Sequence, residues 1–177
     1  EQNSKQAIVA VGAGRMGRGI AHIFAFSGYP VTLLDVKERS EGDFVKLSEA
    51  ARAEIRGNYQ LLASMDVLND AQIEKAMSLI SVVPLAKSAA VLAQASAVVE
   101  GVPETLEAKE SALKLIGEHT QPGVAVLSTT SSMLVTDLQK YISQPERFLN
   151  AHFLNPAFLI PLVEISPGPQ TDEKIVE

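Results

Sequence analysis

The chain has 177 residues, a formal net charge of −6 at pH 7 and a hydrophobic fraction of 46%, values typical of one globular domain. Its acidic balance disfavours a nucleic-acid-binding protein, and the absence of cysteine excludes a disulfide scaffold, a thiol nucleophile and a cysteine-ligated zinc site. No apolar run approaches the ~20 residues of a membrane span, and residues 1–6 lack the apolar segment of a signal peptide, so we expect a soluble, cytoplasmic protein with no membrane or nucleic-acid partner.

The first part of the chain has the pattern of a strand, a helix and a second strand. Residues 7–11 form a short apolar run, typical of a buried parallel strand. Residues 15–27 carry apolar side chains at helical spacing, and Gly28 suits the end of that helix. Residues 31–34 form the second apolar run. The three segments span about the ~30 residues of a βαβ unit, so we predict that the two strands are parallel.

Helices and strands continue to alternate along the rest of the chain. Two helical segments, residues 43–65 and residues 70–77 with Asn69 as N-cap, form a helical excursion after the second strand. The later strands are expected at residues 79–83, 97–99, 123–127, 148–153 and 162–165, and the later helices at residues 86–94 and 105–119. This alternation predicts an α/β fold with a doubly wound, mostly parallel Rossmann-type sheet.

The turn between the first strand and the first helix is rich in glycine and reads Gly12-Ala13-Gly14-Arg15-Met16-Gly17. Gly12 permits the tight turn, Gly14 lets the backbone approach a pyrophosphate, and Gly17 allows the helix to pack closely on the sheet. The helix N-terminus then offers backbone N–H groups to the phosphates. We therefore take Gly12, Gly14, Arg15, Met16 and Gly17 as cofactor-binding candidates.

Asp35 ends the second strand, where an acidic residue completes a dinucleotide site. Its carboxylate can accept hydrogen bonds from ribose hydroxyls, and its charge would repel a 2′-phosphate. The glycines and Asp35 together predict NAD as the cofactor rather than NADP. Lys37 and Arg39 lie close by in the sequence and are the feature that argues against this preference.

Polar side chains also follow the later strands, and a parallel sheet binds ligands at the carboxyl ends of its strands. His152 ends a strand and is our candidate general base. Glu164 stands between aliphatic residues on a strand that we expect to be buried, so its charge needs a partner. A histidine paired with a carboxylate is held in one tautomer and stabilised as imidazolium. His22 and His119 lie in expected helices and are interpreted as structural or solvated.

Several motifs resemble those of the 3-hydroxyacyl-CoA dehydrogenases, including bacterial 3-hydroxybutyryl-CoA dehydrogenases, in their N-terminal NAD-binding domain. The resemblance covers nearly the whole chain and rests on residues 12–21, 98–100, 104–109, 130–132, 152–156 and 162–165. It implies that His152 is the base, that Glu164 orients it and that the hydroxyl of Ser131 contacts the substrate oxygen. It also implies that Glu104 and Lys109 lie near the nicotinamide ribose.

The resemblance implies a reaction in which His152 removes the 3-hydroxyl proton of a 3-hydroxyacyl-CoA while C3 gives a hydride to NAD. Members of the family have a C-terminal helical domain that completes the substrate pocket and the dimer. We therefore interpret residues 1–177 as a single NAD-binding domain and expect a homodimer when the protein is full length. A frayed natural terminus is the alternative to a longer protein.

Two departures from the family pattern leave the acyl specificity open, namely Thr129 in place of the usual Asn and Leu154 in place of the commoner Phe. One alternative function is a related dehydrogenase that acts on a free hydroxy acid or a hydroxymethyl compound with the same histidine and glutamate. Another is a non-catalytic NAD-binding protein, which would not need His152, Ser131 and Glu164 together.

Overall fold

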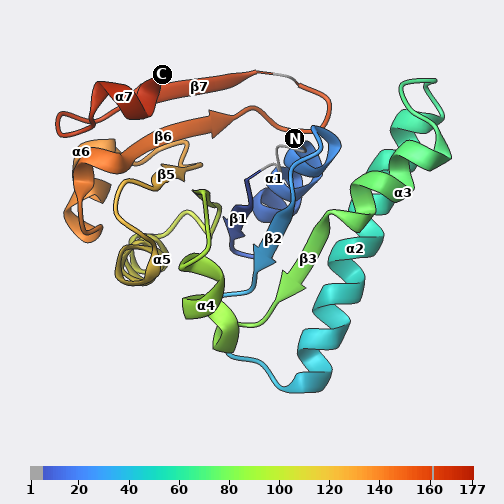
Figure 1. Ribbon diagram of the computed structural model, residues 1–177, viewed down its shortest axis with the longest axis horizontal. Helices are drawn as coiled ribbons and strands as arrows, with labels where there is room; N and C mark the ends of the chain where they lie inside the picture. Colours follow the sequence, from blue (N-terminus) through green and yellow to red (C-terminus); the bar gives the residue numbers. More distant parts are fainter. Residues whose placement is uncertain (1–5, 161) are drawn as a thin grey trace, which may run out of the picture.

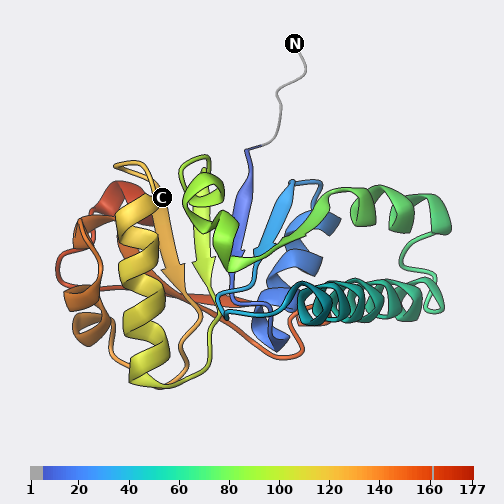
Figure 2. The same ribbon diagram turned by 90° about the horizontal axis from the view of Figure 1, so that it is seen from below.

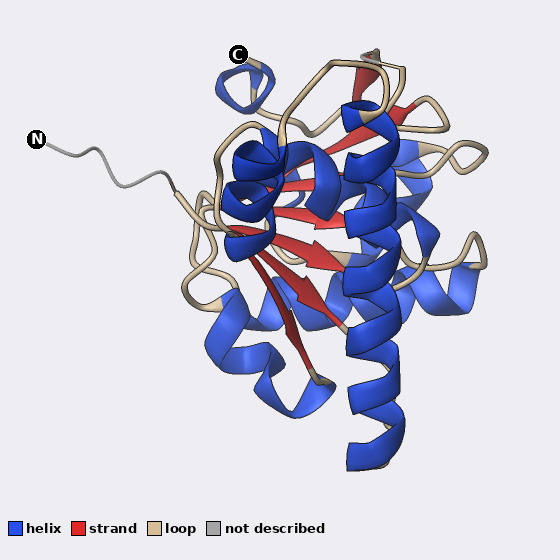
Figure 3. Cartoon of the chain, turned by 90° about the vertical axis from the view of Figure 1, so that its right-hand side faces the viewer, coloured by secondary structure: helices blue, strands red, loops and turns tan. Residues whose placement is uncertain are grey.

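The computed structural model describes residues 6–160 and 162–177, which fold around one twisted sheet (Figures 1 and 3). In this part of the chain the strand order is β3-β2-β1-β4-β5-β6-β7, and every neighbouring pair except the last is parallel. The strands are β1 (Ile8–Val11), β2 (Val31–Leu34), β3 (Ile80–Val83), β4 (Ala97–Glu100), β5 (Ala125–Ser128), β6 (Phe148–Phe153) and β7 (Val163–Pro167). The predicted mostly parallel Rossmann-type fold is confirmed.

The helices lie on both faces of the sheet, with α1, α2 and α3 on one side and α4, α5 and α6 on the other (Figure 1). They are α1 (Arg15–Phe26), α2 (Glu41–Ala63), α3 (Asp70–Ser78), α4 (Ser88–Leu92), α5 (Leu106–His119), α6 (Val135–Leu138) and α7 (Glu173–Val176). Figure 2 shows α2 and α3 side by side beyond the β3 edge, as the predicted helical excursion. Asn69 caps α3 in a reciprocal capping box with Gln72. None of the described helices is both long and apolar enough to cross a bilayer.

The central strand β1 shows why the strands read as continuous apolar runs. Ile8 and Ala10 pack into the core on the α1 side, whereas Val9 and Val11 pack into the core on the α5 side. Because helices cover both faces of a parallel sheet, successive side chains along the strand are all apolar. Because β1, β2, β4 and β5 are parallel, their carboxyl ends lie at the same edge of the sheet. The polar residues follow the strands at that edge.

His22 lies on the buried face of α1, as expected for a structural residue. Its ring is 2% exposed and stacks on Tyr59 with 4.0 Å between ring centroids. Burial lowers the pKa of His22 to about 4, because the charged form is poorly solvated there. The ring is therefore neutral at pH 7 and packs as an aromatic side chain.

The last strand, β7, corrects one prediction. We expected Glu164 on a buried strand, but all of β7 is exposed. The strand runs antiparallel to β6 and forms the edge of the sheet. None of the described residues between the two strands is helical, and a parallel return would need a crossover of a dozen or more residues. A short connection therefore permits only the antiparallel arrangement, and every residue of this edge strand is exposed.

The turn from β1 into α1 brings two backbone segments so close together that a side chain does not fit between them. Gly12 has φ +101°, a backbone conformation that side chains disfavour. A Cβ on Gly17 would lie 1.7 Å from the carbonyl oxygen of Gly12. In contrast, a Cβ on Gly14 would have nothing within 4 Å. The close contact at Gly17 lets α1 pack on the sheet. The absence of neighbours at Gly14 leaves open space above the turn.

Replacement of Gly17 by alanine is expected to lower the free energy of unfolding by about 3 kcal/mol or more, because the backbone must separate to admit the methyl group. Urea denaturation measures the change. Gly57→Ala is the matched control: it lies on an exposed part of α2 with open space around it, and should raise stability by about 0.5–1 kcal/mol. A wild-type midpoint for Gly17→Ala would contradict the close contact.

Candidate active site

A cleft of about 510 Å³ lies at the carboxyl ends of the parallel strands. It brings together most of the residues that the sequence predicts for the site: Gly12, Gly14, Arg15, Met16, Asp35, Glu104, Ser131 and His152. Three predicted residues lie outside its lining. Gly17 packs beneath the glycine turn, Lys109 is buried under the cleft, and Glu164 contacts His152 from β7.

The N-terminus of α1 forms the middle of the cleft. Gly14 is the N-cap residue, and the helix starts without a side-chain cap and without an acidic residue in its first turn. The first N–H groups of a helix have no partner within the helix, and its dipole favours an anion at that end. Arg18 also lines the cleft, donates from Nε to the carbonyl oxygen of Ala13 at 3.0 Å and forms an ion pair with Glu54. This end of α1 therefore fits a pyrophosphate.

Asp35 lies to one side of the glycine turn, at the end of β2. Its side chain is 3% exposed, and its Oδ1 accepts a hydrogen bond from the backbone N–H of Lys37 at 3.3 Å. Its Oδ2 forms an ion pair with Nε of Arg39 at 2.6 Å. A carboxylate fixed at this point is suited to accept hydrogen bonds from a ribose. The sequence shows Arg39 only as a neighbour, whereas the structure makes it the direct partner of Asp35.

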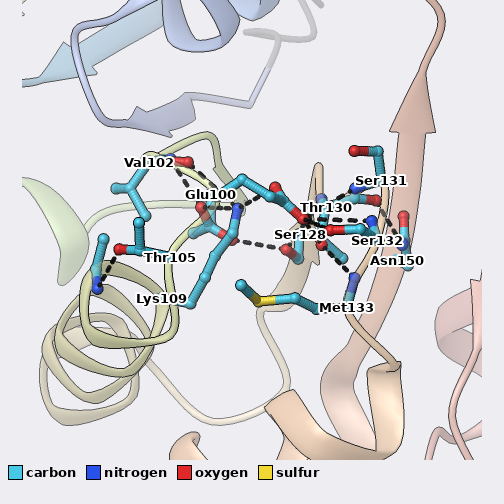
Figure 4. A network of polar contacts seen from close by, with 12 residues as sticks. Glu100, Val102, Thr105, Lys109, Ser128, Thr130, Ser131, Ser132, Met133 and Asn150 are labelled. Atoms are coloured by element: carbon cyan, nitrogen blue, oxygen red, sulfur yellow. Dashed lines mark hydrogen bonds and ion pairs between the residues drawn. The ribbon is translucent and has the colours of Figure 1, made fainter.

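Glu104 follows β4, which lies across β1 from β2, and it holds the hydroxyl-rich loop after β5, whose residues Thr130, Ser131 and Ser132 are labelled in Figure 4. Its Oε1 accepts hydrogen bonds from the Thr130 hydroxyl, from the backbone N–H groups of Ser131 and Ser132, and from the Ser132 hydroxyl. Burial alone raises the pKa of Glu104, but the hydrogen bond from Thr130, the charge of Lys109 and the hydrogen bonds from Ser132 outweigh it and lower the pKa. An ionised Glu104 thus ties Ser131 into the cleft.

Lys109 and Glu100 form a fully buried ion pair (Figure 4). Nζ of Lys109 lies 2.9 Å from Oε1 of Glu100 and 3.5 Å from Oε2 of Glu104. Glu100 also accepts hydrogen bonds from the backbone N–H of Val102 at 2.7 Å and from the Ser128 hydroxyl at 2.6 Å. With none of its side chain exposed, Lys109 can reach a nicotinamide ribose only indirectly, through Glu104.

The sequence contained a signal for the burial of Lys109. It precedes Leu113 by four residues and Ile116 by seven, the spacing of one helix face. Both of these residues are fully buried against the sheet. A lysine on the apolar face of α5 needs a buried acid, and the strand-end glutamates are the acids within reach. Glu100, Ser128 and Thr130 are the members of this network to which no individual role was given from the sequence.

His152 and Glu164 face each other across β6 and β7, in direct register. Nδ1 of His152 lies 2.8 Å from Oε2 of Glu164, and the two side chains are 33% and 63% exposed. A carboxylate at Nδ1 favours the tautomer in which that nitrogen carries the proton. Nε2 has no hydrogen-bond partner among the residues that the structure describes, and it is therefore left as the acceptor.

Comparison with known proteins agrees with this geometry. A family model described as "3-hydroxyacyl-CoA dehydrogenase, NAD binding domain" matches residues 7–177. The chain belongs to the 3-hydroxyacyl-CoA dehydrogenase family. The match confirms the resemblance seen in the sequence and confirms NAD as the predicted cofactor.

Named relatives of this 3-hydroxyacyl-CoA dehydrogenase domain act on different compounds. It is 35% identical to a 3-hydroxybutyryl-CoA dehydrogenase of Bradyrhizobium diazoefficiens, over 94% of this chain and 54% of that protein. It is 33% identical to an L-carnitine dehydrogenase of Streptomyces coelicolor, over 93% of this chain and 48% of that protein. The crystal structure of (S)-3-hydroxybutyryl-CoA dehydrogenase from Ralstonia eutropha superimposes with a TM-score of 0.86 at 28% identity, over 97% of this chain and 57% of that one. The chain thus spans about half the length of the curated relatives it matches.

In this dehydrogenase domain, Lys109→Met is expected to lower the free energy of unfolding by about 3–5 kcal/mol, because Glu100 is left as a buried charge without its cation. Urea denaturation measures the loss. The double variant Lys109→Met/Glu100→Gln should recover part of it, since no unpaired charge remains.

The matched control is Lys114→Met on the exposed face of α5, where the lysine forms a surface ion pair with Glu110. It should leave the unfolding midpoint unchanged. A Lys109→Met protein as stable as the Lys114→Met protein would show that the buried pair does not hold the cleft together.

Proposed function

We propose that this chain is the NAD-binding domain of a longer dehydrogenase that oxidises the 3-hydroxyl group of a 3-hydroxyacyl-CoA to a ketone. The observation that carries the proposal is the His152–Glu164 pair, in which Nδ1 and Oε2 are 2.8 Å apart and the histidine lines the same cleft as the glycine turn and Asp35. A dinucleotide-binding protein without a reaction would not need an oriented histidine at that place. Membership of the dehydrogenase family supports an oxidoreductase.

Different residues of the cleft lining fit the pyrophosphate and the two riboses of NAD. The first turn of α1 would hold the pyrophosphate, and the open space above Gly14 leaves room for it. Asp35 would accept hydrogen bonds from the adenosine ribose, and Glu104 lies on the side where the nicotinamide ribose would lie. When bound, NAD supplies the hydride acceptor.

The side chains of the second half of the cleft would handle the proton. Glu164 fixes Nδ1–H of His152, so that Nε2 accepts the proton of the substrate hydroxyl. Glu164 also stabilises the imidazolium that forms. Ser131, which Glu104 holds through its backbone N–H at 3.3 Å, would donate its hydroxyl to the substrate oxygen. The base and the donor thus come from β6 and from the loop after β5.

A second candidate is a dehydrogenase of a free hydroxy acid. The observation that favours it is the relative named L-carnitine dehydrogenase, which matches nearly the whole of this chain. The same pairing of His152 with Glu164 would serve both reactions. A panel of 3-hydroxyacyl-CoA esters and free 3-hydroxy acids, tested on the full-length protein, separates the two candidates by their values of kcat/KM.

The chain itself is expected to bind NADH, as measured by nucleotide fluorescence. Gly14→Ala should weaken this binding by at least about tenfold, because its methyl group projects into the space for the pyrophosphate, while the unfolding midpoint stays close to wild type. Turnover of acyl-CoA by residues 1–177 alone should be poor if the part of the relatives that this chain does not span completes the substrate pocket. Failure to bind NADH at millimolar concentration would refute the cofactor site.

In the full-length protein, His152→Gln is expected to lower kcat by a factor of about 10²–10⁴, the contribution of one general base. NADH affinity should stay close to wild type, because the imidazole acts on the proton of the substrate. Glu164→Gln should give a smaller loss, since the ring is still present but less well oriented. His119→Gln at the end of α5, outside the cleft lining, is the matched control. Unchanged turnover in His152→Gln would remove this residue from the mechanism.

A further inference from the structure

The adenosine end of the cleft contains a cation in contact with the acid that should select NAD. Nε of Arg39 lies 2.6 Å from Oδ2 of Asp35. The carboxylate is buried, with 3% of its side chain exposed, whereas the arginine side chain is 30% exposed. The two residues sit in the short connection between β2 and α2, and both line the cleft. Arg39 is therefore part of the surface that a bound nucleotide would meet.

The guanidinium uses only part of its hydrogen-bonding capacity on Asp35. Its single contact is made by Nε, and neither Nη1 nor Nη2 has a hydrogen-bond partner in the part of the chain that the structure describes. Each Nη carries two N–H donors, which form a planar fork suited to phosphate oxygens. The donors that remain after the contact with Asp35 can thus still form a bidentate contact with a phosphate group.

The charge at this end of the cleft also differs from that of an isolated acid. Asp35 is the one acidic residue of its connection that lines the cleft, and Lys37 and Arg39 line it as well. Glu38 lines a neighbouring groove, which Pro84 and Leu85 also border, and does not line the cleft itself. Two cations therefore face one anion at the place where an adenosine ribose would lie. A carboxylate here favours a free 2′-hydroxyl, and a neighbouring arginine accommodates a 2′-phosphate.

We propose that Arg39 allows the adenosine end of this cleft to bind NADP(H) as well as NAD(H). The Nη donors of Arg39 bind the 2′-phosphate, Lys37 adds positive charge, and Asp35 accepts from the remaining ribose hydroxyl. The inference rests on the proposed cofactor site at Gly12 to Gly17. The competing role for Arg39 is a clamp that only orients Asp35 for the ribose of NAD, and the two roles predict different effects of its removal.

The experiment is a fluorescence titration of the chain with NADH and with NADPH, in the wild type and in Arg39→Gln. We expect the wild type to bind both nucleotides. Arg39→Gln should lose at least about tenfold more in NADPH affinity than in NADH affinity, the size of one charge-assisted hydrogen bond. Arg39→Lys, which retains the charge but not the fork, should keep part of the NADPH affinity. Added salt should weaken NADPH binding more than NADH binding.

Arg56→Gln is the matched control, since Arg56 pairs with Glu74 on the surface of α2 and α3 and is outside the cleft lining. It should bind both nucleotides as the wild type does. Binding of NADH without NADPH in the wild type would overturn the inference and leave the cofactor site standing. An equal loss of both nucleotides in Arg39→Gln would also overturn it and assign Arg39 the clamp role. Binding of neither nucleotide by the wild type would overturn the cofactor site together with the inference.

Discussion

Gly17 packs against the carbonyl oxygen of Gly12 at a distance that leaves no space for a side chain. This contact brings the first turn of α1 over the end of β1, and β1 lies between β2 and β4 in the sheet. The side chains that follow β2 and β4 are thereby placed on either side of the same helix end. Asp35 and Glu104 owe their common cleft to that arrangement. The position of α1 is thus the constraint that the rest of the site depends on.

The meeting of the glycine turn, α1 and Asp35 in one cleft could be predicted from the sequence because these elements are local. The glycines, α1 and Asp35 lie within one βαβ unit, where spacing along the chain fixes spacing in space. The same applies to β6, whose bounds Phe148–Phe153 match the expected segment. The parallel order and the helical excursion followed from the alternation of apolar runs with helical patterns. Family membership and NAD were likewise predicted and confirmed.

Contacts that depend on how strands and loops meet were harder to predict. The helical spacing of Lys109 indicates that it is buried, but the hydrogen bond from Ser128 to Glu100 joins residues 28 positions apart, and no short pattern in the chain predicts it. The ion pair of Arg39 with Asp35 depends on the path of the connection before α2 rather than on residue type. The aliphatic neighbours of Glu164 suggested a buried strand, whereas β7 is an exposed edge strand. Apolar composition predicts a strand but does not predict whether other elements cover it.

The position of that edge strand gives the His152–Glu164 pair an unusual dependence on strand pairing. The two residues meet only because β7 adds to β6 in one register, with His152 opposite Glu164 and Phe153 opposite Val163. A shift of β7 by one residue would turn its side chains to the other face and leave an aliphatic residue opposite the histidine. Such a misregistered molecule would keep the whole nucleotide cleft, yet its imidazole would lack an orienting carboxylate. The orientation of His152 therefore depends on the correct pairing of a single edge strand, whereas the nucleotide cleft does not.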